Sequence, residues 1–239
     1  MEMKLLVGPV SEEEVKILLD TDVNILDVKN TKEGSYGAAK PRLISNVKNL
    51  LVRSNKIVSA TLGDLPNKPG TAALAALGAV KSGASILKVG LHDATTYDDG
   101  LAIVNAIEDA ISLSGENVSV FVGGYADYEK IGSIQPETLI EIAKISNSVG
   151  VMLDTAYKDG ESLFDILGVD RVRRFVRKAH DEGLEVVLAG SIQKSHIHII
   201  SDIKPDVVAV RGSVCVNGDR TKGIDVERVK ELVNNLKKS

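Results

Sequence analysis

The sequence has little cysteine and few aromatic residues. Cys215 is the only cysteine among 239 residues, which excludes an intrachain disulfide and a cysteine-rich metal site. We expect it to be a buried free thiol. Tryptophan is absent and aromatic residues make up 3% of the chain, so the stacking platforms of nucleic-acid-binding proteins are not expected. A formal net charge of -4 also argues against a nucleic-acid partner or an anionic membrane surface.

Long hydrophobic runs are also missing. No apolar stretch approaches the length of a membrane span, and residues 1–4 do not begin the charged and then apolar pattern of a signal peptide. We therefore expect a soluble, cytoplasmic protein. The chain is 44% hydrophobic and 26% charged, which is an ordinary globular composition with enough apolar residues for one large core.

Short β-branched, apolar runs alternate with helical patterns along the whole chain. Helices are expected after Ser11, which with Glu14 forms a capping-box pattern, and from Pro41 and Pro136, where the missing N–H costs nothing. The expected strands are residues 4–7, 23–28, 57–61, 86–89, 118–122, 151–153, 185–188 and 207–210. The other expected helices cover about residues 72–81, 97–114, 170–182 and 194–201, and a last one starts at Asp225.

Alternating strands and helices indicate a parallel sheet, because parallel neighbours need helical crossovers. Eight such units in one compact chain favour a single (β/α)8 barrel, with residues 1–239 forming one catalytic domain. The alternative is an open doubly wound sheet. No Gly-x-Gly-x-x-Gly motif follows the first strand, which removes the best sign of its dinucleotide-binding version.

Ionisable residues gather where the expected strands end, which is where such barrels carry their active sites. Asp27 and Lys29 share one strand face, because side chains alternate. Lys88 interrupts an apolar strand, and a lysine among apolar neighbours has a lowered pKa and can act as a nucleophile or a base. Asp154 and Lys158 follow the sixth strand. For each residue a structural role stays open: a rim ion pair for Lys29, a stem that reaches water for Lys88, or a turn or helix cap for Asp154.

The seventh and eighth strands end in small residues, where many barrels bind phosphate. These are Gly190 with Ser191, and Gly212 with Ser213. Glycine lets backbone N–H groups approach an anion closely, and Arg211 could add a fork of donors. The alternative is a pair of ordinary tight turns.

The histidines are weaker candidates. His196 and His198 resemble a metal-ligand pair, but positions two apart diverge around a helix, so we expect no metal site. His92 follows the fourth strand and is expected to be a solvated loop residue.

Several segments at these rim positions match one known family, in order along nearly the whole chain. They are Asp27-Val28-Lys29-Asn30, Glu33-Gly34-Ser35, Val58-Ser59-Ala60-Thr61, Lys68-Pro69-Gly70-Thr71, Leu87-Lys88-Val89-Gly90, Gly124-Tyr125-Ala126-Asp127, Met152-Leu153-Asp154-Thr155-Ala156, Lys158-Asp159-Gly160, Leu188-Ala189-Gly190-Ser191 and Val210-Arg211-Gly212. The sequence thereby resembles (5-formylfuran-3-yl)methyl phosphate synthase, also described as 4-(hydroxymethyl)-2-furancarboxaldehyde phosphate synthase, an enzyme of methanofuran biosynthesis in methanogens. The sequence departs from the family pattern at Lys32 and Tyr36, in a loop that varies among members, so the resemblance implies the reaction class but not the detail of this loop.

The resemblance implies a barrel that condenses two molecules of glyceraldehyde 3-phosphate into a phosphorylated furan aldehyde, with loss of phosphate and water. It implies a lyase with no organic cofactor. By residue match, Lys29 is the Schiff-base lysine and Lys88 the proton-accepting lysine. The residues alone support only a Schiff-base chemistry on a small phosphorylated carbonyl compound, and they do not tell which lysine has which role.

Two alternatives remain open at this stage. One is another class I aldolase-like or isomerase barrel that acts on a different sugar phosphate. The other is a non-catalytic barrel that binds a phosphorylated metabolite, which would have no use for Lys88 among apolar residues. A triose phosphate is the expected small-molecule partner, and a homo-oligomer is left open.

Overall fold

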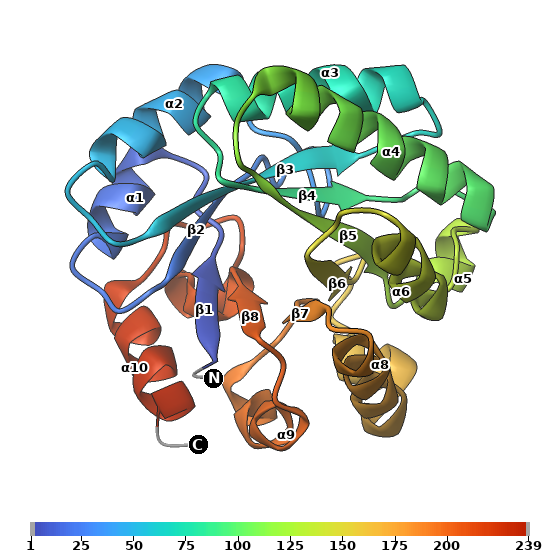
Figure 1. The fold of residues 1–239 in the computed structure, drawn as a ribbon. Coiled ribbons are helices and arrows are strands. Elements are labelled where there is room, and N and C mark those ends of the chain that lie inside the picture. The colour runs from blue at the N-terminus through green and yellow to red at the C-terminus, as the bar shows by residue number, and fades with distance from the viewer. Residues whose placement is uncertain (1–2, 238–239) are drawn as a thin grey trace.

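Eight parallel strands close into a barrel in the computed structural model, which describes residues 3–237 (Figure 1). Each strand pairs with its sequence neighbours, and β1 pairs with β8. The strands are β1 (Lys4–Val7), β2 (Ile25–Val28), β3 (Ile57–Asp64), β4 (Ile86–Gly90), β5 (Ser119–Tyr125), β6 (Gly150–Asp154), β7 (Glu185–Leu188) and β8 (Val207–Val210). The predicted (β/α)8 barrel is therefore confirmed.

Helices surround the strands (Figure 1), because the outward strand faces are apolar and must be covered. The helices that follow the strands are α1 (Glu12–Leu18), α2 (Pro41–Leu50), α3 (Pro69–Lys81), α4 (Tyr97–Ser114), α6 (Pro136–Ile145), α8 (Val169–Asp181), α9 (Ile197–Ile203) and α10 (Val226–Lys237). Two short helices, α5 (Tyr128–Ile131) and α7 (Leu163–Leu167), lie in the connections after β5 and β6. These two helices were not predicted, because segments of four and five residues are too short to show a helical periodicity.

The start of α1 differs from the predicted capping box. The side chain of Ser11 accepts a hydrogen bond from the Glu14 N–H, as expected. The Glu14 carboxylate, however, accepts from the Val10 N–H and from Arg211 instead of returning to Ser11. The second hydrogen bond of the capping box is therefore missing, and Arg211, which is distant in sequence, binds the Glu14 carboxylate instead.

Side chains on alternate strand positions fill the barrel interior and form a small separate core. That core includes Leu6, Ile25, Phe121, Met152, Val187 and Val207. The same alternation carries Asp27, Lys88 and Asp154 to the inner face, two positions beyond apolar members of their strands. The barrel thus has an apolar lower interior and a charged upper interior.

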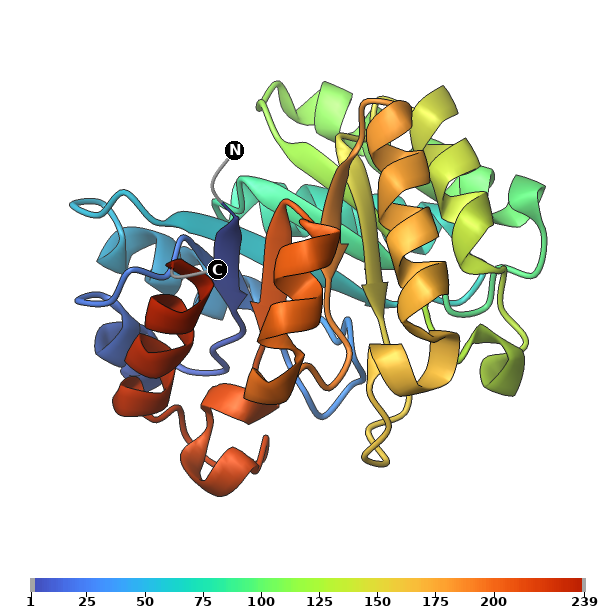
Figure 2. The same ribbon diagram turned by 90° about the horizontal axis from the view of Figure 1, so that it is seen from below.

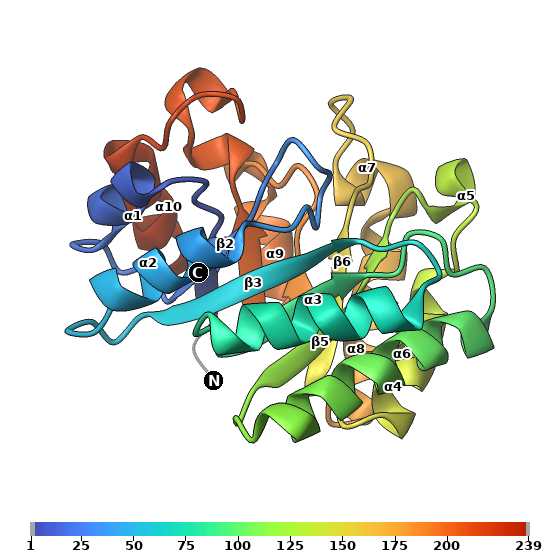
Figure 3. The same ribbon diagram turned by 90° about the horizontal axis from the view of Figure 1, so that it is seen from above.

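The loops that follow the strands lie together on one side of the barrel (Figures 2 and 3). The loops after β2, β6 and β8 stand close to one another there, in blue, yellow and red-orange in both views. They are anchored to each other: the hydroxyl of Ser35, after β2, donates to the Thr155 carbonyl, after β6, at 2.6 Å. Among the described helices none has the length and apolar character needed to cross a membrane.

Candidate active site

Lys88 and Asp27 form an ion pair inside the barrel, beneath the rim. The Lys88 Nζ contacts Asp27 Oδ1, and both side chains are only 1% exposed. Asp27 Oδ1 also accepts a hydrogen bond of 2.9 Å from the Ser59 hydroxyl. The structural roles left open by the sequence were an ion pair between Lys29 and Asp27, and a Lys88 side chain whose ammonium group reaches water. Neither structural alternative describes this arrangement.

Burial lowers the pKa of Lys88 below that of a free lysine, because an ammonium ion is poorly solvated there. The Asp27 carboxylate opposes this shift, and the nearby charge of Lys29 adds to it. Asp27 Oδ2 is buried and has no hydrogen-bond partner among the described residues. A buried amine with a lowered pKa beside a half-satisfied carboxylate is suited to accept and pass on a proton.

Lys29 lies just beyond the end of β2, above this pair. Its Nζ donates a hydrogen bond of 3.3 Å to the Ser35 carbonyl. Its charge influences the pKa values of Lys88, Asp154 and Lys158. Lys29 is therefore electrostatically linked to every other predicted catalytic lysine and to the acid at the end of β6.

Asp154 and Lys158 form a second ion pair, at the end of β6. Lys158 Nζ lies 2.5 Å from Asp154 Oδ1 and also donates to the carbonyl and hydroxyl of Thr155. Burial raises the pKa of the Asp154 carboxyl, but Lys158, Lys29 and hydrogen bonds outweigh burial, so the pKa lies below its usual value. Burial lowers the pKa of Lys158, against the pull of Asp154.

A cavity of about 650 Å³ opens between the ends of β6, β7, β8 and the Lys29 loop. It brings together three of the predicted catalytic residues and all five predicted phosphate-binding residues. These are Lys29, Asp154, Lys158, Gly190, Ser191, Arg211, Gly212 and Ser213. Asp27 and Lys88 do not line it, and lie buried in the barrel interior.

The turns after β7 and β8 form the far wall of this cavity. Gly190 and Ser191 both have positive φ, 95° and 50°, which bends the chain sharply at the end of β7. The Ser213 hydroxyl is buried without a hydrogen-bond partner in the described part of the chain. Both turns line this wall, so a small anion in the cavity would lie beside their backbone.

Arg211 lines the cavity, yet its donors point into the protein. The guanidinium donates to both Glu14 oxygens, at 2.9 and 3.2 Å, and to the Gly8 carbonyl at 2.7 Å. It also reaches the carbonyls of Arg220 and Lys222. These five bonds use all five N–H donors of an arginine. Arg211 therefore ties the loop after β8 to the β1 end, and its predicted contact with phosphate stays a prediction.

Arg220 was missed by the sequence analysis. It lies in the loop after β8, half-buried, and lines the cavity beside Asp154. Burial lowers its pKa, while Asp154 opposes that shift. The sequence shows that Arg220 is a cationic residue after the last strand, but it does not show whether the side chain of a loop residue points toward the cavity.

Tyr36 was also missed, as a residue whose ring covers the ends of β4 and β5. Its ring is fully buried and lies over two glycines: a Cβ on Gly90 or Gly123 would fall within 2.7 Å of ring atoms. The ring meets that of Tyr125 edge-on at 5.5 Å. The Tyr36 hydroxyl donates to the carbonyls of Gly124 and Met152. The open cavity is thereby limited to the side of β6, β7 and β8.

Cys215 and the histidines lie in different surroundings. Cys215 is buried and free. His196 packs edge-on against Phe164, and His92 pairs with Asp93 near the surface. Within residues 3–237 no cluster of three His, Cys, Asp or Glu side chains is placed as metal ligands would be.

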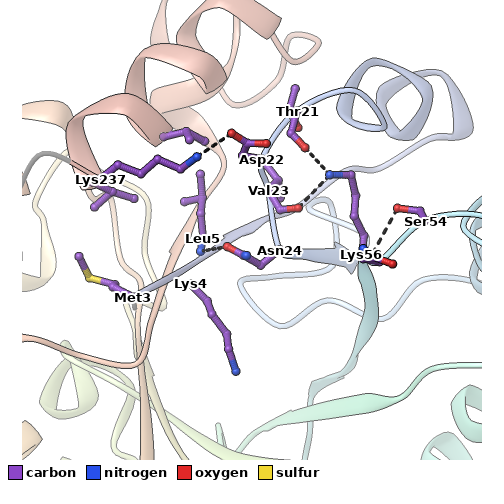
Figure 4. A pocket seen from close by; sticks show the side chains of 13 residues that line it. Met3, Lys4, Leu5, Thr21, Asp22, Val23, Asn24, Ser54, Lys56 and Lys237 are labelled. Atoms are coloured by element: carbon purple, nitrogen blue, oxygen red, sulfur yellow. Dashed lines mark hydrogen bonds and ion pairs between the residues drawn. The ribbon is translucent and has the colours of Figure 1, made fainter. Parts of the chain in front are cut away.

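A hollow of about 710 Å³ lies at the opposite end of the barrel, where the strands begin (Figure 4). Three of its four charged side chains bind to the protein: Lys56 donates to the carbonyls of Thr21 and Val23, and Lys237 pairs with Asp22 (Figure 4). Because it lies away from the strand ends that carry the charged cluster, we do not assign the chemistry to it.

The sequence matches one family over nearly its whole length. A family model described as 4-HFC-P synthase matches residues 5–233. A (5-formylfuran-3-yl)methyl phosphate synthase of Methanocaldococcus jannaschii is 44% identical over 231 residues, 96% of this chain and 98% of the relative. One of Methanobrevibacter smithii is 40% identical over 238 residues, 98% of this chain and 100% of the relative.

Solved structures of other barrels superpose on most of the chain. Phosphoribosyl anthranilate isomerase of Thermus thermophilus gives a TM-score of 0.63 at 14% identity, covering 99% of each chain. A 3-hexulose-6-phosphate synthase gives 0.61 at 17% identity, covering 96% of this chain and 99% of the other. At such low identity these similarities establish the fold alone.

Proposed function

Because the chain belongs to the 4-HFC-P synthase family, we propose that it forms (5-formylfuran-3-yl)methyl phosphate from two molecules of glyceraldehyde 3-phosphate. The composition of that product supports this stoichiometry. Two triose phosphates supply its carbon atoms, and removing one phosphate and two waters from the pair leaves its formula. The reaction therefore needs carbon–carbon bond formation, a phosphate elimination and dehydrations, and no net change of oxidation state.

The single observation that carries the proposal is the coupling of two lysines at one site: Lys29 beside the cavity, and the buried Lys88 below it. Lys29 attacks the aldehyde carbon and expels its oxygen as water, which forms an imine. The protonated imine draws electrons from the adjacent carbon and acidifies its proton. Lys88, with its lowered pKa, removes that proton.

Elimination follows from this proton transfer. The electron pair released from the C–H bond moves toward the iminium, and its return expels phosphate from the neighbouring carbon with cleavage of a C–O bond. The carbon nucleophile of such an enamine can also add to the aldehyde of the second triose phosphate. Asp27, next to Lys88, passes the proton onward. Lys158 and Asp154 lie beside Lys29 and serve the proton transfers of dehydration.

Phosphate binding falls to the wall formed by the turns after β7 and β8. The residues are Gly190, Ser191, Gly212 and Ser213, with Arg211 holding the loop. Backbone N–H groups of both turns bind the ester oxygens at the cavity wall, and the unpaired Ser213 hydroxyl is a further donor. A triose phosphate bound in this way has its carbonyl end toward Lys29.

The test is incubation with glyceraldehyde 3-phosphate, followed by ultraviolet absorbance of a furan, released phosphate and the product mass. We expect one phosphate released for each furan phosphate formed. A trapped imine without a furan product would favour another aldolase-like or isomerase activity. Binding with neither imine nor turnover would favour a non-catalytic phosphometabolite-binding barrel.

A further inference from the structure

A second hollow of about 510 Å³ adjoins the first, between the loops after β1, β2, β6 and β8. The two hollows share a wall made by Lys158, Arg211 and Arg220. The outer hollow is lined by Val10, Thr31, Lys32, Gly34, Ser35, Ala156, Lys158, Arg211, Arg220 and Thr221. A molecule bound there would lie directly beside one bound in the inner cavity.

All the charged residues that line the outer hollow are cationic. Four of its residues are cationic and none is acidic, whereas the inner cavity includes Asp154 and Asp219. Two of the four charges are already balanced, because Arg211 pairs with Glu14 and Lys158 with Asp154.

The other two cationic side chains have no ion-pair partner among the described residues, although Asp154 acts on Arg220 from the inner cavity. The side chains of Lys32 and Arg220 form no ion pair and donate no hydrogen bond to any residue from 3 to 237. Lys32 is exposed at the mouth, and Arg220 is half-buried at the shared wall. Two cations without an ion-pair partner, around a hollow that no carboxylate lines, match the charge of a phosphate monoester dianion.

We propose that the outer hollow is a second phosphate-ester subsite, which holds the second triose phosphate beside the one bound as an imine, with Lys32 and Arg220 as its anion-binding residues. This inference rests on the proposed function, because a reaction that joins two phosphorylated molecules needs two anion sites within bonding distance of one lysine. The shared wall of Lys158 and Arg220 keeps the two phosphates apart and neutralises their repulsion.

Glycerol 3-phosphate is the probe, because it carries the phosphate ester but has no carbonyl group to form an imine. Isothermal titration should give two molecules bound per wild-type chain. Lys32→Gln should weaken one of the two sites by about 10-fold, and the Lys32→Gln/Arg220→Gln pair by about 100-fold or more, as expected for lost charge-assisted bonds. Arg53→Gln removes the same charge from an exposed position at the other end of the barrel and should leave both sites unchanged.

One bound molecule in the wild type, or two unweakened sites in the double variant, would overturn the proposal. Borohydride trapping in Lys32→Gln supplies a second readout. The substrate adduct on Lys29 should form as in the wild type. Furan formation should be slower, and should need about 10-fold more glyceraldehyde 3-phosphate to reach half its maximal rate. Equal loss of adduct and furan in this variant would also overturn it. If the wild type makes no furan at all, the proposed function fails, but the glycerol 3-phosphate titration still decides whether the second subsite exists.

Discussion

The amine of Lys88 lies against the carboxylate of Asp27 inside the barrel, with both side chains all but inaccessible to solvent. A buried ion pair is seldom more stable than a well-packed apolar pair of the same size, because both charges lose their hydration. We infer that this pair is kept for proton transfer, and that the neighbouring apolar residues serve to lower the pKa of the amine.

Replacement of Lys88 by arginine should separate charge from basicity. Lys88→Arg keeps a positive charge beside Asp27 but cannot lose its proton. We expect kcat to fall by about 10² to 10⁴, the usual contribution of a general base. The thermal unfolding midpoint and the imine adduct on Lys29 should persist, and both are measured as controls. Turnover near the wild-type rate would leave Lys88 with an electrostatic role only.

Lys29 should carry the covalent adduct. Borohydride reduction in the presence of glyceraldehyde 3-phosphate is expected to add the substrate mass to the peptide that contains Lys29, and peptide mass spectrometry identifies the site. Lys29→Arg should abolish the adduct. A label on Lys88 or Lys158 instead would reassign the nucleophile.

The pH dependence of turnover should respond to Asp27. A base must be deprotonated, so the rate rises with pH through the pKa of Lys88. Asp27 raises that pKa against the effect of burial, so Asp27→Asn should lower it and move the rising limb of the kcat profile to lower pH. The matched control is Asp64→Asn, which removes another carboxylate at the end of a strand, one that accepts a hydrogen bond from the Tyr125 hydroxyl. A shift to higher pH in Asp27→Asn would contradict the assignment.

Much of the barrel could be predicted from alternation alone. The strands at 4–7, 185–188 and 207–210 have their predicted bounds. By contrast, β3 and β5 run further than predicted, to Asp64 and Tyr125. Their last residues include glycines, which resemble turn signals in a sequence. In the folded chain the glycines of β5 belong to the strand, and the side chains of Tyr36 and Leu139 occupy the space that their Cβ atoms would take.

The site could be predicted only as a set of residues at one rim. Strand alternation brings Asp27 and Lys88 to the inner face, but their pairing depends on strand register, in which Asp27 lies opposite Ser59 and Lys88 opposite Thr61. Arg220 could not be placed, because its loop is held by Arg211 and hence by Glu14, a residue 197 positions from Arg211. Contacts across such separations leave no local pattern.

Breaking the Glu14–Arg211 pair should destabilise the protein and weaken substrate binding together. Arg211→Ala leaves Glu14 charged, buried and unpaired, which costs about 3–5 kcal/mol of unfolding free energy. The KM should rise, since the loop with Arg220 loses its support. Arg173→Ala breaks an exposed pair with Asp170 and should change stability by less than about 0.5 kcal/mol. Denaturant unfolding and steady-state kinetics measure both effects, and an unchanged KM for Arg211→Ala would remove Arg211 from the site.

Tyr36 should be more important for its ring than for its hydroxyl. Tyr36→Phe loses hydrogen bonds of 3.3 and 3.4 Å to two carbonyls and should cost about 1 kcal/mol. Tyr36→Ala empties a buried ring position and should cost about 3–5 kcal/mol. Urea unfolding compares the two variants, and equal losses would mean that the hydroxyl carries most of the effect.

The position of the Tyr36 ring over the ends of β4 and β5 has a stereochemical consequence. A planar imine on Lys29 would have the Lys88–Asp27 pair on its barrel side and the open cavity toward β6, β7 and β8 on the other. The two faces of such an imine are inequivalent, because base and incoming aldehyde reach it from different directions. Proton removal and carbon–carbon bond formation would then each have a fixed handedness, because the Tyr36 ring leaves the cavity open on one side only.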